Sequence, residues 1–302
     1  MKKFNFKSKK FLTAAFFITS GLTIFSPSNP VKAEGVCPDA STITSPNGLG
    51  DATSFINVVN GNCYGTPEEY GVTIFRMGLC TSDPAPTSAG SAPDTSSCSF
   101  TFEKDDSIGE PKSFAAGGVV DLSEEYSSAP AVGDYTYALI EIAPTFDIKA
   151  KYGPIGDADR TTYFTNGTFA SYGTVTGATA TPPASEYKVT SAPLNTFYGD
   201  EGEEVCTATA SETVADGTIS AYLLDSSGNL IADDSSSTSC SGVTKLFGVM
   251  TLTDDVNITA STSSLQATFT VTNNGTTIVY DDGTDGIKFD SGPFSVTFET
   301  SE

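Results

Sequence analysis

"YGVTIFRMGLC", residues 70–80, is the clearest strand signal in this sequence. Its apolar residues occupy first one side of an extended chain and then the other: Tyr70, Val72 and Ile74, followed by Phe75, Met77 and Leu79. Alternation with a period of two is typical of a β-strand, and the change of side predicts a strand that is buried on both faces or bent by a bulge. Directly before it, "TPEEY" predicts one helical turn, with Thr66 as its cap and Pro67 as its first residue.

The predicted strand runs into a loop that is enclosed by two cysteines. Between Cys80 and Cys98 lie 17 residues drawn only from Thr, Ser, Asp, Pro, Ala and Gly. A loop of this composition cannot build a core, but a disulfide at its ends lets it be long without loosening the strands that it joins. We therefore expect an exposed surface projection, and a spacer loop without a partner is the alternative.

All six cysteines lie beyond residue 33: Cys37, Cys63, Cys80, Cys98, Cys206 and Cys240. An even number predicts three disulfides that form in an oxidising compartment. Pairing of sequence neighbours is favoured, because each neighbouring pair flanks a loop-like stretch. Other pairings and free buried thiols are the alternatives.

Residues 1–33 have the pattern of an export signal. Lysines make a basic start, residues 11–25 are mostly apolar, and the small residues Val31 and Ala33 precede Glu34. The apolar stretch is shorter than the ~20 residues that span a bilayer, which favours a cleaved signal over a membrane anchor. No second apolar run follows, so membrane insertion after cleavage is not expected. We predict a secreted or extracellular cell-surface protein, with the periplasm as an alternative.

The charge and the missing residue types exclude several functions. Cleavage before Glu34 leaves nine Lys and Arg against thirty-seven Asp and Glu, a net charge of about −28. Such a charge disfavours nucleic acid and anionic membranes as partners. The chain has no His and no Trp, which excludes Ser-His-Asp and Cys-His catalysis and zinc sites built on imidazole. No P-loop, dinucleotide-binding or Cys-x-x-Cys motif occurs, so no nucleotide or redox cofactor is expected, and calcium alone stays open.

Short strands separated by turn residues recur along the rest of the chain. They are rich in Thr, Val, Tyr and Phe, which predicts an all-β, antiparallel β-sandwich stabilised by disulfides. The expected strands and hairpins are 99–102, 133–144, 146–153, a hairpin over 161–173 turning at Asn166-Gly167, a hairpin over 219–234 turning at 226–229, 245–253, 257–262, and 265–282 with turns at 273–275 and 281–286, then 293–299.

A division into two packed lobes is expected around a stretch that is poor in bulky residues, "TVTGATATPPAS" at 174–185. It separates an N-terminal β-sandwich lobe, 34–173, from a C-terminal β-rich lobe, 201–302, with 174–200 as linker or connecting strands. One large sandwich is the alternative.

The strand expected at 133–144 opens with Gly133, Asp134 and Tyr135 after the loop "SSAPAV". This opening resembles the Gly-x-Tyr start of a strand in secreted bacterial β-sandwich modules of the prealbumin-like and fimbrial kind. The resemblance covers about a dozen residues. It implies a fold neighbourhood and carries over no functional residue.

Acidic loops are the candidates for a metal site. "YDDGTDG" supplies Asp281, Asp282 and Asp285, and its glycines allow a tight turn. Calcium takes six to eight oxygen ligands, which carboxylates and backbone of such a loop can provide in part. The spacing is not that of an EF-hand, and an ordinary hairpin turn is the alternative. "GDADR" at 156–160 and "GDEGEE" at 199–204 are further candidates.

Three functions are compatible with these features. The first is an exported structural or adhesive surface protein, a subunit of a fibre, pilus-like appendage or surface layer that self-assembles into a filament or layer. Residues 34–50 would be a free extended arm that adds to a neighbour's sheet edge, unless Cys37 ties this arm to its own chain. The alternative is a monomeric extracellular module that binds a surface glycan or calcium. A secreted glycoside hydrolase with two carboxylates is the third.

Overall fold

The computed structural model describes residues 35–43, 62–104, 108–114, 127–156, 160–197, 205–214, 217–281, 286–292 and 294–301. The predicted export signal lies outside these ranges, as does the part of the expected arm that follows Ile43. In the described part, no helix is long and apolar enough to cross a membrane.

Within these ranges the chain forms one short 3₁₀ turn, η1 (Ala40–Thr42), and otherwise β-strands. The strands are β1 (Asn62–Gly65), β2 (Glu69–Cys80), β3 (Cys98–Glu103), β4 (Glu110–Phe114), β5 (Gly133–Ile142), β6 (Thr145–Lys149), β7 (Lys151–Ile155), β8 (Thr161–Phe164), β9 (Gly173–Thr176), β10 (Thr190–Pro193), β11 (Thr209–Val214), β12 (Gly217–Leu224), β13 (Lys245–Ile258), β14 (Ser264–Thr270), β15 (Thr276–Asp281), β16 (Gly286–Ser291) and β17 (Ser295–Ser301). Every pairing between these strands is antiparallel, which confirms the predicted all-β, antiparallel fold class.

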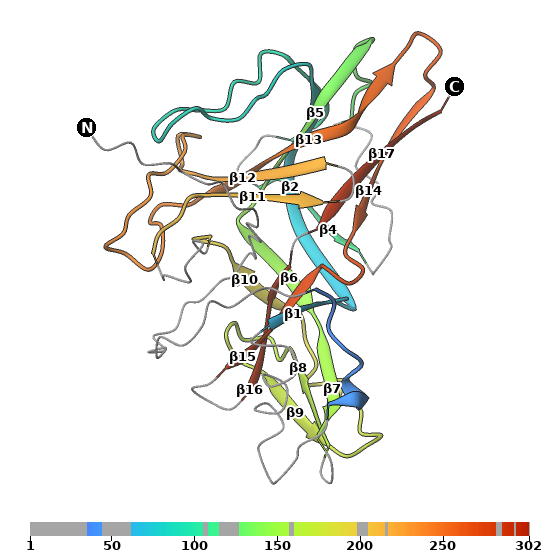
Figure 1. Ribbon diagram of the computed structural model, residues 1–302, viewed down its shortest axis with the longest axis vertical. Helices are drawn as coiled ribbons and strands as arrows, with labels where there is room; N and C mark the ends of the chain where they lie inside the picture. Colours follow the sequence, from blue (N-terminus) through green and yellow to red (C-terminus); the bar gives the residue numbers. More distant parts are fainter. Residues whose placement is uncertain are drawn as a thin grey trace, which may run out of the picture.

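The main sheet has nine strands. Its hydrogen-bonded neighbours follow the path β10-β6-β2-β5-β13-β12-β11, and β3 and β4 also pair with β2. Three smaller sheets are β1-β15-β16, β7-β8-β9 and β14-β17. Figure 1 shows the pair β14–β17 beside the main sheet, and the two three-stranded sheets toward the opposite end of the long axis.

β2 is the strand around which the main sheet is built. It pairs with β5 and β6 along one edge and with β3 and β4 along the other. Its register with β5 shifts between Ile74 and Arg76, where the apolar residues change sides, and Ile74 and Phe75 are both buried. A bulge and burial on both faces therefore occur together, as the change of side predicts.

Two local predictions are wrong. Residues 66–68 form no helical turn: they only join β1 to β2, and the Thr66 hydroxyl accepts the Asn273 backbone N–H at 2.7 Å instead of capping a helix. Asn166-Gly167 is not a two-residue hairpin turn, because β8 pairs with β9 across the eight-residue segment 165–172. That segment bonds elsewhere, since the Lys188 N–H donates to the Thr165 carbonyl at 3.1 Å.

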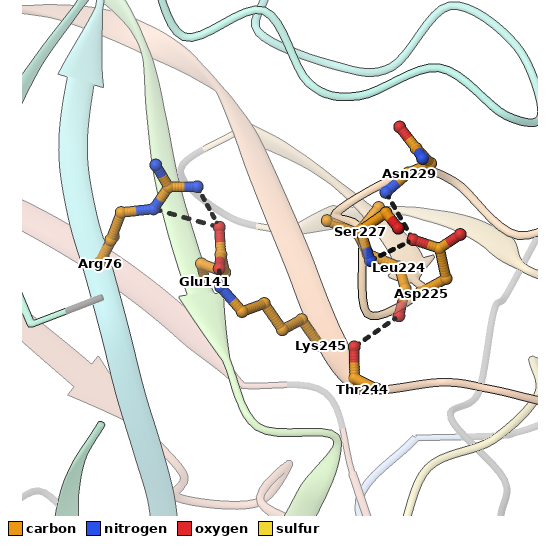
Figure 2. Close-up of polar contacts among 8 residues, drawn as sticks. All are labelled: Arg76, Glu141, Leu224, Asp225, Ser227, Asn229, Thr244 and Lys245. Carbon is orange, nitrogen blue, oxygen red and sulfur yellow. Dashed lines mark hydrogen bonds and ion pairs between the residues drawn. The ribbon is translucent and has the colours of Figure 1, made fainter. Parts of the chain in front are cut away.

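The predicted turn at 226–229 is confirmed. The Asp225 N–H donates to the Asn229 carbonyl at 2.9 Å and the Gly228 N–H to the Asp225 carbonyl at 3.0 Å. The Asp225 carboxylate accepts the backbone N–H groups of Ser227 and Asn229, as Figure 2 shows. Residues 273–275, by contrast, connect two different sheets, because β14 pairs with β17 and β15 with β1 and β16.

The division into lobes expected at 174–200 stays a prediction, and the main sheet contains strands from both sides of it. β5 and β13, which lie on either side of that boundary in sequence, are neighbours over most of their length. Residues 190–193 are themselves a strand of the sheet, β10, paired with β6. β1 and β15 form a further pairing between the two halves of the chain.

Three disulfides join sequence neighbours, Cys37 to Cys63, Cys80 to Cys98 and Cys206 to Cys240, which confirms the predicted pairing. Such bonds persist outside the reducing cytoplasm. The first one ties the start of the described chain to β1, where the Cys37 N–H donates to the Tyr64 carbonyl at 2.8 Å. Ile43 is fully buried, so residues 35–43 are not a free arm.

Candidate functional site

The acidic loops that could bind calcium lie mostly beyond the described residues. The described ranges do not include Asp282, Asp285, Asp157, Asp159 or the candidate at 199–204. Asp281 is the last residue of β15 and lies opposite Gly286, the first residue of β16. No group of three or more His, Cys, Asp or Glu in the described ranges is placed to hold a metal ion. The calcium hypothesis therefore stays a prediction.

The loop between Cys80 and Cys98 is exposed but anchored at its tip. Cys80 and Cys98 lie directly opposite each other in β2 and β3. At the far end, the Gly90 N–H donates to the Leu230 carbonyl at 2.8 Å, and the Leu230 N–H donates to the Ser91 carbonyl at 2.9 Å. Residues 87–90 stay exposed. The disulfide thus holds the base of the loop, and the hydrogen bonds to Leu230 hold its tip against the chain that follows the turn at 226–229. Figure 1 shows the loop in teal, extending away from β2.

One face of the main sheet carries a buried ion cluster. Glu141 on β5 lies between Arg76 on β2 and Lys245 on β13, and its side chain is 1% exposed. The Arg76 Nε donates to Glu141 Oε2 at 3.2 Å, and both cations form ion pairs with the carboxylate. Figure 2 shows the two cationic side chains converging on Glu141.

Aromatic rings support both cations of this ion cluster. Arg76 lies over the Phe100 ring at 5.3 Å and Lys245 over the Phe75 ring at 5.0 Å from the ring centroid. The carboxylate binds cations from the strands on both sides of β5, so the arrangement links the three central strands. A buried carboxylate that is paired with two cations in this way has a structural role. The sequence does not reveal that Arg76, Glu141 and Lys245 lie together, because their strands are far apart along the chain.

The opposite face of the main sheet is hollowed into a small apolar cleft with a cavity volume of about 70 Å³. Alternate residues of a strand point to the same face. The register therefore places Ala210 of β11, Ala221 of β12 and Gly248 of β13 in one row across three neighbouring strands, all lining the cleft. Because these side chains are small, they leave a trough in the sheet surface.

Larger apolar side chains border this trough on both sides. Ile219 and Met250 form the next row along the strands in one direction, and Leu246 lies in the next row in the other direction. The cleft is lined from other parts of the chain by Phe146, Phe294 and Phe298. The cleft is thus an apolar space between the main sheet and the segments around β16 and β17.

Glu212 of β11 is the one acidic side chain among the described residues that line the cleft. Its Oε2 atom is buried and has no hydrogen-bond partner among the described residues. Burial raises the pKa of this carboxyl to about 7. In turn, burial and the nearby Glu212 charge raise the pKa of Tyr64 above its ordinary value. Glu212 is therefore a partly buried acid with one oxygen left without a partner in an apolar cleft.

The cleft does not assemble the pair of carboxylates that glycoside hydrolysis requires, as far as its described lining goes. Sequence reasoning missed Glu212, which lies in an ordinary-looking stretch, "TASETV". The sequence does contain one usable signal. Small residues at positions that pair with one another on successive strands indicate a depression on one face of a sheet.

No protein-family model, curated protein or solved structure matches this chain.

Proposed function

We propose that this protein is an exported structural or adhesive surface protein that assembles into a filament or layer through an edge of its main sheet. The observation that carries the proposal is the edge strand β11. One side of β11 pairs with β12, and within the described ranges no strand pairs with its other side. An unpaired sheet edge is a template for a strand of a neighbouring molecule.

The hydrogen-bond pattern identifies the groups that this edge presents. The Leu223 N–H donates to the Ala208 carbonyl at 2.9 Å, and the pairing continues in register through Glu212 and Ile219. In an antiparallel ladder, alternate residues direct their N–H and C=O groups to opposite sides. The residues whose backbone groups point away from β12 are therefore Thr209, Ser211 and Thr213.

The rest of the chain suits a durable surface protein. The start of the described chain and two of its loops are each closed by a disulfide. The large negative charge opposes contact between copies at low salt, and screening removes that repulsion as ionic strength rises. Assembly should accordingly increase with salt.

The test is negative-stain electron microscopy of the exported chain from Glu34, in oxidising buffer at low and high salt, with calcium and with a chelator. Thr213→Pro removes one outward N–H without touching the β11–β12 ladder. Thr213→Ala is the matched control, because it removes the side chain and keeps the N–H. We expect filaments or sheets from the unaltered chain and from Thr213→Ala, and none from Thr213→Pro.

Two outcomes contradict the proposal. Discrete monomers of the unaltered chain in every buffer would point instead to the monomeric glycan- or calcium-binding module. Filaments that persist in Thr213→Pro would show that β11 is not the joint. Loss of filaments in chelator alone would support calcium at the acidic loops as part of the joint.

A further inference from the structure

We infer that β11 pairs with β11 of a second copy of this chain, antiparallel and about a two-fold axis that passes beside Ser211. The inference rests on the proposed function and deepens it, because it names the strand that occupies the unpaired edge. Figure 1 shows β11 at the margin of the main sheet, beside β12. Pairing at this margin joins the main sheets of two copies into one.

The free part of this edge is short and has a fixed beginning. Thr207, two residues before β11, already uses its outward backbone groups. Its N–H donates to the Thr196 hydroxyl at 2.9 Å, and its carbonyl accepts the Phe197 N–H at 2.8 Å. The segment that contains these two partners therefore covers the edge before β11. Together with the end of β11, this leaves residues 209–213 for a second copy.

Three residues present their backbone groups along this length: Thr209, Ser211 and Thr213. Thr209 and Thr213 are exposed, and in the described part of the chain no strand lies along their outward side. The three residues are spaced evenly about Ser211. The edge is therefore complementary to itself when a second copy runs antiparallel and Ser211 faces Ser211. About six backbone hydrogen bonds then form, because each of the three facing pairs exchanges two.

The side chains also match in this register. Ser211 faces Ser211 and Thr209 faces Thr213, and pairs of hydroxyl side chains on facing strands are favourable. On the cleft face, Glu212 lies opposite the small Ala210 of the second copy. The two Glu212 carboxylates are then diagonal neighbours, so no like charges face each other directly.

Neighbouring registers fit less well. A two-fold axis shifted to Glu212 places the two carboxylates directly opposite each other, which destabilises a pair of strands. A shift to Ala210 places Thr213 against Thr207 of the second copy, whose backbone groups are already bonded. The chain thus favours one register, with Ser211 on the axis.

The symmetry of the contact determines the unit of assembly. A two-fold contact uses the same strand of both copies, so β11 is occupied in each of them. The growing unit of the proposed filament or layer is then a pair of copies and not a single chain. Pairing should need salt, because the chain from Glu34 carries a net charge of about −28.

The test places single cysteines on β11 of the chain from Glu34, in oxidising buffer at about 1 M sodium chloride, where the Debye length is about 3 Å. Facing residues that exchange two hydrogen bonds have Cα atoms about 5.5 Å apart, which is within the range of a disulfide. Ser211→Cys should therefore form a disulfide with itself across the axis. Non-reducing gel electrophoresis measures the cross-linked fraction.

Two further positions define the register. Thr209→Cys and Thr213→Cys should each form few dimers alone, because about 14 Å along the strand separates each residue from its own copy. Mixed together they should cross-link, because Thr209 faces Thr213. Thr87→Cys, on the exposed tip of the loop at 81–97, is the control for random collision. Ser211→Cys should form at least about tenfold more dimer than this control, because its thiols are held at a high effective concentration.

Hydrogen exchange of the unaltered chain tests the same edge without any variant. The backbone N–H groups of Ser211 and Thr213 should exchange more slowly as the protein is concentrated, because pairing protects them. Exchange that does not change with concentration would overturn the inference, and so would the absence of any assembly.

The failure of this inference can be distinguished from the failure of the proposed function. Cross-linking of Ser211→Cys at the level of Thr87→Cys, together with slowed exchange in the unaltered chain, would show that β11 pairs with a different strand. That result overturns the inference and leaves the proposed function in place. More dimer from Thr209→Cys or Thr213→Cys alone than from Ser211→Cys would overturn the register.

Discussion

The main sheet carries one glutamate on each of two opposite faces, Glu141 fully buried and Glu212 with one buried oxygen, and their surroundings differ. Glu141 has ion pairs with Arg76 and Lys245, so its charge is compensated within the fold. Glu212 faces an apolar cleft with one oxygen left without a partner in the described structure. The comparison separates a carboxylate whose charge is compensated by cations on neighbouring strands from one that has no compensating cation in its cleft.

The largest effect is expected from removing the compensated carboxylate. Glu141→Ala leaves two cations facing each other without a counter-charge and should lower the free energy of unfolding by about 3–5 kcal/mol. Urea unfolding followed by far-UV circular dichroism measures this loss. Glu69→Ala is the control: Glu69 pairs with Lys149 while 45% of its side chain is exposed, so it should cost less than about 1 kcal/mol. Equal losses of unfolding free energy in the two variants would contradict the special role of Glu141.

The disulfide beside the ion cluster should have the next largest effect. Cys80 lies on β2 on the same face as Arg76, and its partner Cys98 begins β3, which also carries the Phe100 ring below Arg76. Replacing both cysteines by serine opens a loop of 17 residues and should cost about 3 kcal/mol. Thermal unfolding of the double variant checks this. An unchanged melting temperature would show that the anchor at Leu230 holds the loop without the disulfide.

The smallest effect concerns pH and belongs to the two acids whose pKa burial raises most clearly, Glu212 and Asp290. Burial raises the pKa of Glu212 and of Asp290 to about 7, above their unfolded values. The native state then retains protons that the unfolded chain releases between about pH 4 and 7, so the contribution of these two acids to stability is greatest below pH 4 and is lost as pH rises to 7. The charged or titratable neighbours are Tyr64 for Glu212 and Lys288 for Asp290.

Glu212→Gln should reduce this fall in stability between pH 5 and pH 8 by about 1 kcal/mol, since partial exposure of the side chain screens the effect. Asp290→Asn, fully enclosed in β16, should reduce it by more. Urea unfolding at the two pH values is the measurement. The same change in stability between pH 5 and pH 8 in both variants and in the unaltered chain would contradict the assignment of both acids.

The sequence predicts what depends on near neighbours. Alternation in residues 70–80 indicates β2, the turn at 226–229 follows from its small polar residues, and pairing of neighbouring cysteines follows from the loops that they flank. A Thr-Pro-Glu-Glu pattern fails to form a helical turn because three residues between two paired strands leave no room for one.

The two faces of the main sheet depend on register between distant strands, which the sequence does not reveal. Arg76 and Glu141 are 65 positions apart, and Lys245 is still farther along the chain. Ala210, Ala221 and Gly248 look like ordinary small residues until pairing places them in one row. The stretch at 174–185 is poor in bulky residues and suggests a boundary. The sequence does not reveal that β5 and β13, on either side of this stretch, pair with each other.

The most direct test of the difference between the two glutamates is carbon NMR of the chain from Glu34, with glutamate labelled at the side-chain carboxyl. Glu212→Gln identifies the Glu212 signal by its loss. As the pH is raised from 3 to 9, this signal should move with a midpoint near pH 7, because burial raises the pKa of Glu212 to about 7. A midpoint near the ordinary glutamate value, about 4, would contradict the account.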